Sequence, residues 1–572
     1  MFHTIPVDMW ASERKDIAQV LLKAILDTKS KSVSCQRSMS CLLDIDMSDS
    51  LCASPRVEIE KFALRVVTES ADALVRAIAH HLKTATPRPL HDLRGSNDDA
   101  VRKLSRIRLE HTQTHTHTNQ VHLLLSLMRH SDWFLAARDT MRSIKFWDMI
   151  VDLLITQGTL SPSGCVELVR CFCTLLQVDN TELSENLLRS ETFLNSSLRL
   201  IQPIHISAIM SWGGEGGGIK GVLTILDTVS NLVRIPFVRN MKNVIRSVQQ
   251  TLYRGQFVSN ALSAIDAVSS SSSSSKSENK DDTTKDDDAS YVETMYVLSK
   301  LVLFSDHFAK QFVNSNGPKR ILRFLKSTHR VSVLIDSLLV FSQLARSSSK
   351  YYEELRSISM ISSLRSLLRH ENDAVRAKTC NLIGNLCRHS ALFYDEVREL
   401  LPDLMKCCRW KDCVKDSSVN RFACFALGNA AYHSDTLYED LRDAIPLLTQ
   451  HLRKSKDEKT RSNAAGALGN LVRNSGVLCT ELERSGCLDV LVRTAFYDPQ
   501  TGPRRIALFS LGNLASYNLC RNRLKRMKDE GGRTSFIDRL MLLENSSSVN
   551  DDKLMAKYTK RLLGKFRVSA SK

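Results

Sequence analysis

The chain has 572 residues, 43% of them hydrophobic, and its 79 Lys and Arg residues outnumber 62 Asp and Glu residues to give a formal charge of +17. Such a composition can bury a large core, which excludes a chain that is disordered throughout. No run of about 18 apolar residues is present, so we expect no membrane span. The N-terminus lacks a signal-peptide pattern and the 15 cysteines are irregularly spaced, so we expect a cytoplasmic protein with buried thiols.

The first 119 residues carry weak structural signals. Residues 1–83 have helical apolar spacing in places and predict a weakly helical segment, whereas residues 84–119 contain prolines and a His-Thr tract and predict a linker. Within that tract, His111, His115 and His117 have the spacing that suits a metal ion on a helix. They lack a second pair of ligands, so we favour low-complexity sequence without a metal.

The middle of the chain predicts helices interrupted by one polar insert. Residues 120–267 have the patterning of degenerate helical repeats, and residues 268–290 are a serine run followed by clustered aspartates. Such a segment cannot bury apolar surface, so we expect a disordered, solvated insert. The glycine-rich stretch 213–221 lacks the Gly-Lys-Ser/Thr ending of a phosphate-binding loop and predicts a loop between helices.

Residues 291–548 repeat a Gly-Asn motif at intervals of 41 to 44 residues, and weaker copies at intervals of 42 and 43 residues extend the repeat upstream. A period near 42 with only helical patterning is typical of armadillo and HEAT repeats, so we predict an all-α, right-handed superhelical solenoid. Residues 549–572 have the pattern of a basic amphipathic helix, which we expect to cap the last repeat.

The repeated motif also predicts a binding groove. In a three-helix repeat the third helices line the concave face, where an Asn amide can hydrogen-bond the backbone of an extended peptide. The predicted groove residues, here called the ladder positions, are Asn385, Asn429, Asn470 and Asn513, preceded by Gln343 and Lys300 in the weaker copies. The alternative is that each Asn bridges neighbouring repeats. We favour the groove, because packing does not easily explain a periodic exposed polar residue.

An arginine lies eight or nine residues before the Asn of each Gly-Asn pair. These residues are Arg376, Arg421, Arg461 and Arg505. They can brace adjacent helices or pair with acidic side chains of a partner. We favour bracing, because a fixed helix position in every repeat is typical of a packing role.

Importin-α is the first armadillo family to compare. That family usually has a Trp four residues before each Asn, and its Trp/Asn pairs hold basic peptides. The corresponding residues here are Asn381, Phe425, Gly466 and Phe509. Without indole faces to hold lysines, an import adaptor is disfavoured.

Several motifs, in order, resemble the C-terminal armadillo region of the Fused family of serine/threonine kinases. They lie at 381–394, 424–432, 461–471 and 558–566, and the resemblance covers about residues 360–570 but is weak before residue 330. It implies a protein-binding scaffold that acts in signalling, cilia or cytokinesis. The implied partner is a kinesin or another microtubule-associated protein, and the implied location is the cytoplasm, at the cytoskeleton or a cilium.

The chain lacks the Gly-rich loop, strand lysine, H-R-D and D-F-G motifs that phosphoryl transfer needs. We therefore expect no catalysis, cofactor or small-molecule substrate in this chain.

The first alternative is that a kinase domain lies upstream in the native protein. The second is a basic surface that binds microtubules or nucleic acid; nucleic acid is disfavoured because aromatics are 6% of the chain and do not interleave with the basic runs. No metal is expected either, since paired ligand spacing is missing among Cys171, Cys173, Cys407, Cys408 and Cys413.

Overall fold

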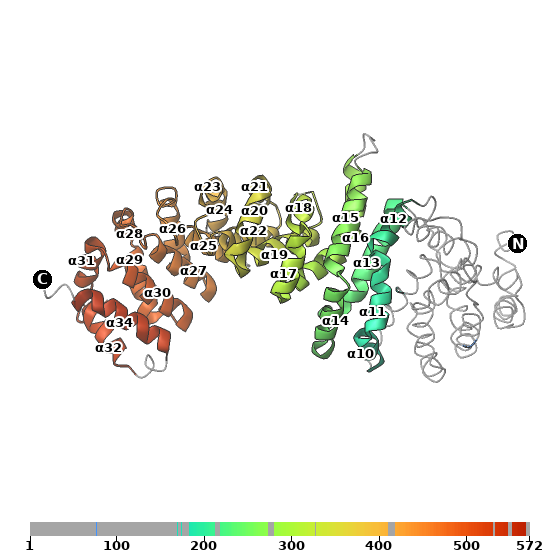
Figure 1. Ribbon diagram of the computed structural model, residues 1–572. Coiled ribbons are helices and arrows are strands. Elements are labelled where there is room, and N and C mark those ends of the chain that lie inside the picture. The colour runs from blue at the N-terminus through green and yellow to red at the C-terminus, as the bar shows by residue number, and fades with distance from the viewer. Residues whose placement is uncertain are drawn as a thin grey trace, which may run out of the picture. The chain divides into compact units, whose positions relative to one another are not determined.

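The protein is described from a computed structural model (Figure 1). The structure describes residues 76, 169, 173, 182–211, 218–272, 280–326, 328–409, 418–529, 532–546 and 552–567. Within these ranges the secondary structure is helical, and the extended backbone is limited to an isolated bridge between Lys528 and Ser535. The predicted all-α solenoid class is thus confirmed, while the predicted linker 84–119 and its histidines lie outside the described residues.

The chain divides into two units, Met1–Val297 and Leu298–Lys572. The described helices of the first unit are α10 (Glu182–Arg189), α11 (Glu191–Leu198), η2 (Arg199–Ile201), α12 (Pro203–Met210), α13 (Gly218–Val238), α14 (Lys242–Arg254), α15 (Phe257–Ser272) and the first part of α16 (Lys280–Phe304). Helix α13 is central among the described helices of this unit, because α12, α14 and α15 all pack against it.

Helix α13 is also the described helix that is long and apolar enough to cross a membrane. However, 67% of its apolar window is buried inside the unit. Its apolar side chains, such as Leu226 and Val229, are fully covered by neighbouring helices. The packing therefore accounts for the composition of α13 as that of a core helix.

The polar insert predicted at 268–290 is shorter in the structure. Helix α15 continues to Ser272 and α16 begins at Lys280, so only residues 273–279 lie outside the described backbone. The prediction of a loop over the whole segment is therefore wrong. Low hydrophobicity argues against burial but does not prevent helix formation next to a packed helix.

The second unit continues from the end of α16 through a series of short and medium helices. They are α17 (Asp306–Asn314), α18 (Gly317–Ile321), η3 (Leu322–Leu325), α19 (Val331–Ser347), η4 (Ser349–Tyr351), α20 (Tyr352–Ser357), α21 (Ile361–Leu368), α22 (Asp373–Leu386), α23 (Tyr394–Arg398), α24 (Leu401–Cys408), α25 (Ser418–Ala430), α26 (Ala444–Lys454), α27 (Glu458–Asn470), α28 (Cys479–Arg484), α29 (Cys487–Tyr497), α30 (Thr501–Leu514), α31 (Asn518–Arg526), α32 (Phe536–Glu544) and α34 (Lys553–Arg567).

Five of these helices form the spine of the second unit. Helices α19, α22, α25, α27 and α30 pack one against the next in chain order, and α34 packs against α30, where the sequence predicts a capping helix (Figure 1). The Gly-Asn motif lies at or near the C-terminal end of α22, α25, α27 and α30. Stacking of equivalent helices is how repeat proteins bury a continuous core.

The glycine of the motif allows this close stacking. A Cβ atom built on Gly469 of α27 would lie 2.7 Å from the Cα atom of Ser510 in α30. A Cβ atom on Gly428 of α25 would lie 3.2 Å from the Cα atom of Ala467 in α27. These positions need glycine because two helix backbones meet there, despite a cost of about 1 kcal/mol for glycine in a helix.

Candidate partner-binding site

The ladder asparagines connect each repeat to the one before it. The Nδ2 atom donates a hydrogen bond in each case: from Asn385 to Ser342 Oγ (2.8 Å), Asn429 to the Gly384 carbonyl (2.8 Å), Asn470 to the Gly428 carbonyl (2.9 Å) and Asn513 to the Gly469 carbonyl (3.1 Å). Asn385, Asn470 and Asn513 are buried, and Asn429 is half-buried. The premise that these residues are exposed is therefore wrong. The alternative interpretation, that each Asn bridges neighbouring repeats, describes the contacts.

A tyrosine ladder, which the sequence reasoning missed, closes the end of three motif helices. Each hydroxyl donates to the Asn carbonyl and accepts from the backbone N–H four residues later. The distance from the hydroxyl to the carbonyl is 2.6 Å for Tyr352, 2.9 Å for Tyr394 and 2.6 Å for Tyr438. The distance from the backbone nitrogen to the hydroxyl is 3.2, 3.0 and 3.1 Å in the same order. Burial raises the pKa of Tyr352 to about 12, so that hydroxyl keeps the proton that it donates. The available signal was a tyrosine 32 to 35 residues before three successive motif asparagines.

A further side chain, four residues after the motif Asn, bonds the preceding repeat. His389 Nε2 lies 2.9 Å from the Arg346 carbonyl and His433 Nε2 lies 3.0 Å from the Arg388 carbonyl. In the following repeat the equivalent residue is Asn474, whose Nδ2 donates to the Tyr432 carbonyl at 3.1 Å. Since a carbonyl only accepts, each of these histidines has its proton on Nε2. The repeats are thus joined by recurring polar contacts as well as by apolar packing.

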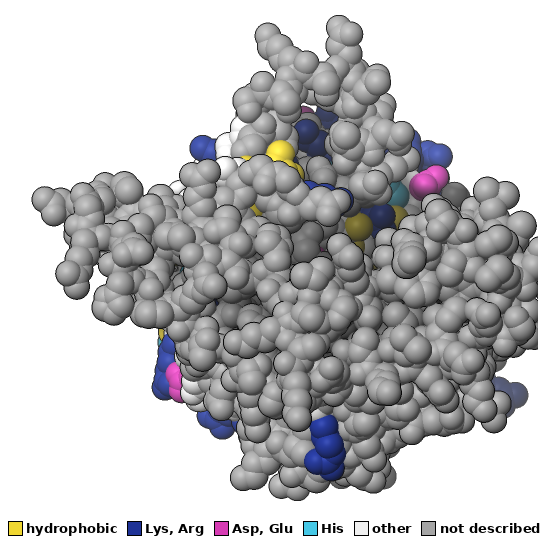
Figure 2. Space-filling view, turned by 90° about the vertical axis from the view of Figure 1, so that its right-hand side faces the viewer, with side chains coloured by type: hydrophobic (Ala, Val, Ile, Leu, Met, Phe, Trp, Pro, Cys, Tyr) yellow, Lys and Arg dark blue, Asp and Glu magenta, His cyan; other side chains and the backbone are white. Residues whose placement is uncertain are grey.

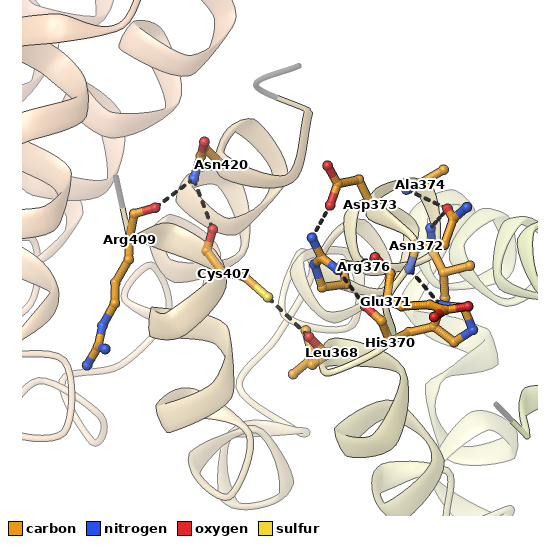
Figure 3. A network of polar contacts seen from close by, with 11 residues as sticks. Leu368, His370, Glu371, Asn372, Asp373, Ala374, Arg376, Cys407, Arg409 and Asn420 are labelled. Atoms are coloured by element: carbon orange, nitrogen blue, oxygen red, sulfur yellow. Dashed lines mark hydrogen bonds and ion pairs between the residues drawn. The ribbon is translucent and has the colours of Figure 1, made fainter. Parts of the chain in front are cut away.

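Arg376 braces the start of its own helix. Its guanidinium donates to the carbonyls of His370 and Glu371, the latter at 2.8 Å, and pairs with Asp373 (Figure 3). The side chain of Asn372 accepts from two backbone N–H groups and caps the same helix, α22. These contacts fix the turn that leads into the motif helix.

Arg461 and Arg505 brace elements of different repeats. Arg461 binds both carboxylate oxygens of Asp498, at 2.7 and 2.8 Å, with side-chain exposures of 11% and 5%. Arg505 Nε lies 2.6 Å from Asp552 Oδ2, just before α34. The bracing interpretation describes Arg376, Arg461 and Arg505. The Arg421 guanidinium lies 4.9 Å from the Phe422 ring centroid, and its bracing role stays a prediction.

Three predicted groove residues come together at a pocket of about 270 Å³ in the second unit. Lys300 is on the end of α16, Gln343 on α19 and Asn385 on α22, so successive repeats each contribute one. Other lining residues are Ser299, Leu303, Leu339, Ser342, Arg346 and Asn381.

The lining of this pocket combines charge, amides and an apolar edge. Lys300 and Arg346 are its cations, and among the described residues no carboxylate lines it. Gln343 Oε1 accepts from Arg346 Nε at 3.0 Å, and Leu303 is 51% exposed. Such a lining is suited to a polar or anionic extended segment, with one apolar side chain against leucine. Asn429, Asn470 and Asn513 do not line this pocket.

Basic side chains lie on the surface of several described elements. Lysine and arginine side chains are prominent among the described residues on the face shown in Figure 2. The last turn of α31 carries Arg523, Lys525 and Arg526, and α34 ends in Lys565 and Arg567. The charge is spread over several elements, and no aromatic stripe accompanies it on α31. This pattern favours acidic partners without indicating a stacking platform for bases.

The stacked helices, the Gly-Asn motif and the bonds between repeats define an α-solenoid of armadillo/HEAT-like repeats. The HEAT-like repeat family matches residues 417–471, which include α25 and α27. A curated relative is the serine/threonine-protein kinase TIO of Arabidopsis thaliana, a Fused-family member. It is 31% identical over 403 residues, covering 64% of this chain. The predicted relationship to the Fused family is thus confirmed, and the chain spans 30% of that relative's length.

Solved repeat structures are also similar. An engineered protein has a TM-score of 0.46 at 16% identity, covering 92% of this chain and 98% of its own. A designed armadillo repeat protein in complex with the peptide (KR)4 has a TM-score of 0.37 at 17% identity, covering 41% of this chain and 95% of its own.

Proposed function

We propose that this chain is the non-catalytic, partner-binding scaffold of a Fused-type protein, and that the pocket formed by α16, α19 and α22 holds an extended acidic segment of a partner. The observation that supports it most is the meeting of Lys300, Gln343 and Asn385 at one pocket. The three residues recur at intervals of 43 and 42 in the sequence, and the packed helices bring them to one pocket.

The chemistry of the lining supports an acidic occupant. Lys300 and Arg346 attract carboxylates, and amide groups such as Gln343 can pair with both donors and acceptors of a peptide backbone. Leu303 and Leu339 provide an apolar wall that limits which side chain fits between the charges. Binding is centred on this pocket because Asn429, Asn470 and Asn513 do not line it.

The resemblance to the Fused family suggests the first partners to test. A kinesin, or another protein of microtubules, cilia or the cytokinetic apparatus, is our candidate source of the acidic segment. We accordingly place the protein in the cytoplasm, at the cytoskeleton or a cilium.

A photo-crosslinking experiment tests the site. A photoreactive phenylalanine at Leu303, in the pocket, should give a defined cross-linked partner in native extract. The same residue at Leu542, which is 67% exposed on α32, serves as the control. The cross-linked partner peptide should be rich in Asp or Glu. Equal cross-linking at both positions, or a basic peptide, would contradict the proposal.

A charge-reversal pair then measures the electrostatic contribution. We expect Lys300→Glu with Arg346→Glu to weaken binding of that acidic peptide by about tenfold or more, because two attractions become repulsions. The matched control reverses Lys319 and Arg453, which are exposed on other helices of the same unit. Fluorescence anisotropy of the labelled peptide gives both affinities, and equal losses in the two double variants would point to the overall charge instead of the pocket.

A second proposal concerns the native polypeptide. The relative is a kinase and the chain spans 30% of it, which favours a native protein with a kinase domain upstream of this region. The deciding observation is the mass of the native protein with peptide mapping around Met1. A species well above 64.4 kDa that contains H-R-D and D-F-G peptides would support this proposal.

A further inference from the structure

A cluster of three buried side chains lies away from the pocket, within the second unit. Cys408 at the end of α24, Cys424 in α25 and His451 in α26 are each 0% exposed. One ligand-type atom from each, a cysteine sulfur or an imidazole nitrogen, lies within 4.8 Å of the other two. Because the three residues come from three helices, their spacing in the sequence matches no metal-binding motif.

The two sulfur atoms are separated by the distance that a zinc ion requires. Cys408 Sγ and Cys424 Sγ are 3.8 Å apart. Two thiolates bound to a tetrahedral zinc ion, each at about 2.3 Å, stand about 3.8 Å from one another. The sulfurs therefore need not move apart or together to hold the ion between them.

The imidazole of His451 is oriented by a hydrogen bond to the backbone beside the cluster. His451 Nε2 lies 2.5 Å from the Cys408 carbonyl oxygen, which only accepts, so Nε2 has the proton. In the neutral ring the lone pair is then on Nδ1, which is buried. A metal-binding histidine is usually oriented in this way: the ring nitrogen that does not bind the metal donates its N–H to a backbone carbonyl or carboxylate.

The backbone around Cys408 is also fixed in place. Asn420 of α25 donates to the carbonyls of Cys407 at 3.0 Å and Arg409 at 3.3 Å, on either side of Cys408 (Figure 3). The helix that carries Cys424 therefore holds the end of the helix that carries Cys408. A preorganised pair of this kind pays little entropy when an ion binds.

We propose that Cys408 Sγ, Cys424 Sγ and a ring nitrogen of His451 bind a zinc ion that ties α24, α25 and α26 together. Thiolate and imidazole ligands suit zinc, whereas calcium and magnesium require oxygen ligands, which this cluster lacks. Binding releases the two thiol protons, and the three side chains fill three of the four tetrahedral positions.

The test uses the full chain, purified without a metal-affinity tag and dialysed after loading with zinc. Elemental analysis should find about one zinc ion per chain. Cys424→Ser and His451→Gln should each lower the zinc content to background. The Gln variant keeps an amide that can donate to the Cys408 carbonyl, so it removes the ligand and retains the neighbouring hydrogen bond. The control is Cys479→Ser, a buried cysteine outside this cluster, which should keep its zinc.

Cobalt substitution covers the case in which a variant fails to fold. The wild-type chain loaded with Co²⁺ should show tetrahedral visible bands and a thiolate charge-transfer band in the near ultraviolet. Absence of these bands from the folded wild-type chain overturns the proposal, as does zinc content that is unchanged in Cys424→Ser and His451→Gln. A disulfide between Cys408 and Cys424 in the anaerobically purified protein, seen as a loss of two hydrogens by mass spectrometry, also overturns it.

Discussion

At the scale of single residues, one hydroxyl can hold the end of a helix and two parts of a repeat together. The Tyr438 hydroxyl donates to the Asn470 carbonyl and accepts from the Asn474 N–H. Both groups are at the helix terminus, where backbone groups have no partner within the helix. The tyrosine therefore stabilises the turn that leaves α27.

We expect Tyr438→Phe to lower the free energy of unfolding by about 1–3 kcal/mol, because it leaves a buried carbonyl and N–H without this partner. Urea unfolding followed by circular dichroism measures the change. The control is Tyr497→Phe, since Tyr497 is 62% exposed. A loss of stability as large in the control would show that the buried hydroxyl is not the cause.

The sequence predicts only some of the contacts between repeats. The sequence identified Asn385, Asn429, Asn470 and Asn513 as a periodic set but not their direction, since an Asn near a helix end can face the groove or the preceding repeat. Packing on the preceding repeat buries Asn385, Asn470 and Asn513 and half-buries Asn429. Cys408, Cys424 and His451 could not be grouped at all, because residues 16 and 27 positions apart meet only through packing of three helices.

At the scale of helices, the glycines of the motif are not equivalent. A Cβ on Gly469 would meet the backbone of α30, whereas a Cβ on Gly512 would meet nothing within 4 Å. The two positions have the same neighbours in sequence, a leucine and an asparagine. Their difference comes only from what each helix faces.

We expect opposite effects from the same substitution at these two positions. Gly469→Ala should destabilise the protein by about 1–3 kcal/mol through overpacking of α27 against α30. Gly512→Ala should raise stability by up to about 1 kcal/mol, because alanine favours the helix and has space. Thermal unfolding of both variants decides it, and a loss of stability in Gly512→Ala would contradict the distinction.

The helix prediction was wrong at residues 268–290, where a polar composition was the basis for predicting a loop. Period and motif predicted the repeat class of the fold, because the same contacts between helices recur in each repeat. The serine and aspartate segment was predicted as a loop, yet α15 and α16 extend into it from both sides. Helices continue through polar sequence when one end is anchored, since extension costs less than nucleation.

At the scale of the whole molecule, stability should be distributed along the repeats, because each repeat contacts mainly its neighbours. The C-terminal helix α34 closes the spine of the second unit by packing against α30 and α32. Its apolar face includes Leu562, Leu563 and Phe566, all buried. Arg561 also donates to Asn513 Oδ1 at 3.2 Å, in the last motif repeat.

We expect Leu562→Ala to loosen the end of the array without unfolding all of it. Removal of a buried leucine side chain costs about 2–5 kcal/mol, and the cost falls on the helices that touch it. Hydrogen exchange should become faster in α30, α32 and α34 and stay unchanged in α19. Leu554→Ala, at a position of the same helix that is 48% exposed, is the control. Faster exchange in every helix of the unit would show global cooperativity instead.

The asparagine bonds that join the repeats have a direction, since the ladder Asn of the later repeat donates to a group of the earlier one in all four cases. Because Asn429, Asn470 and Asn513 each use the carbonyl of the preceding motif glycine, these boundaries are chemically interchangeable. A gene that gained or lost a whole repeat in this region would keep matching donors and acceptors at the new junction. The length of such an array can therefore change in steps of one repeat, and the reach between its two ends can be tuned without inventing a new interface.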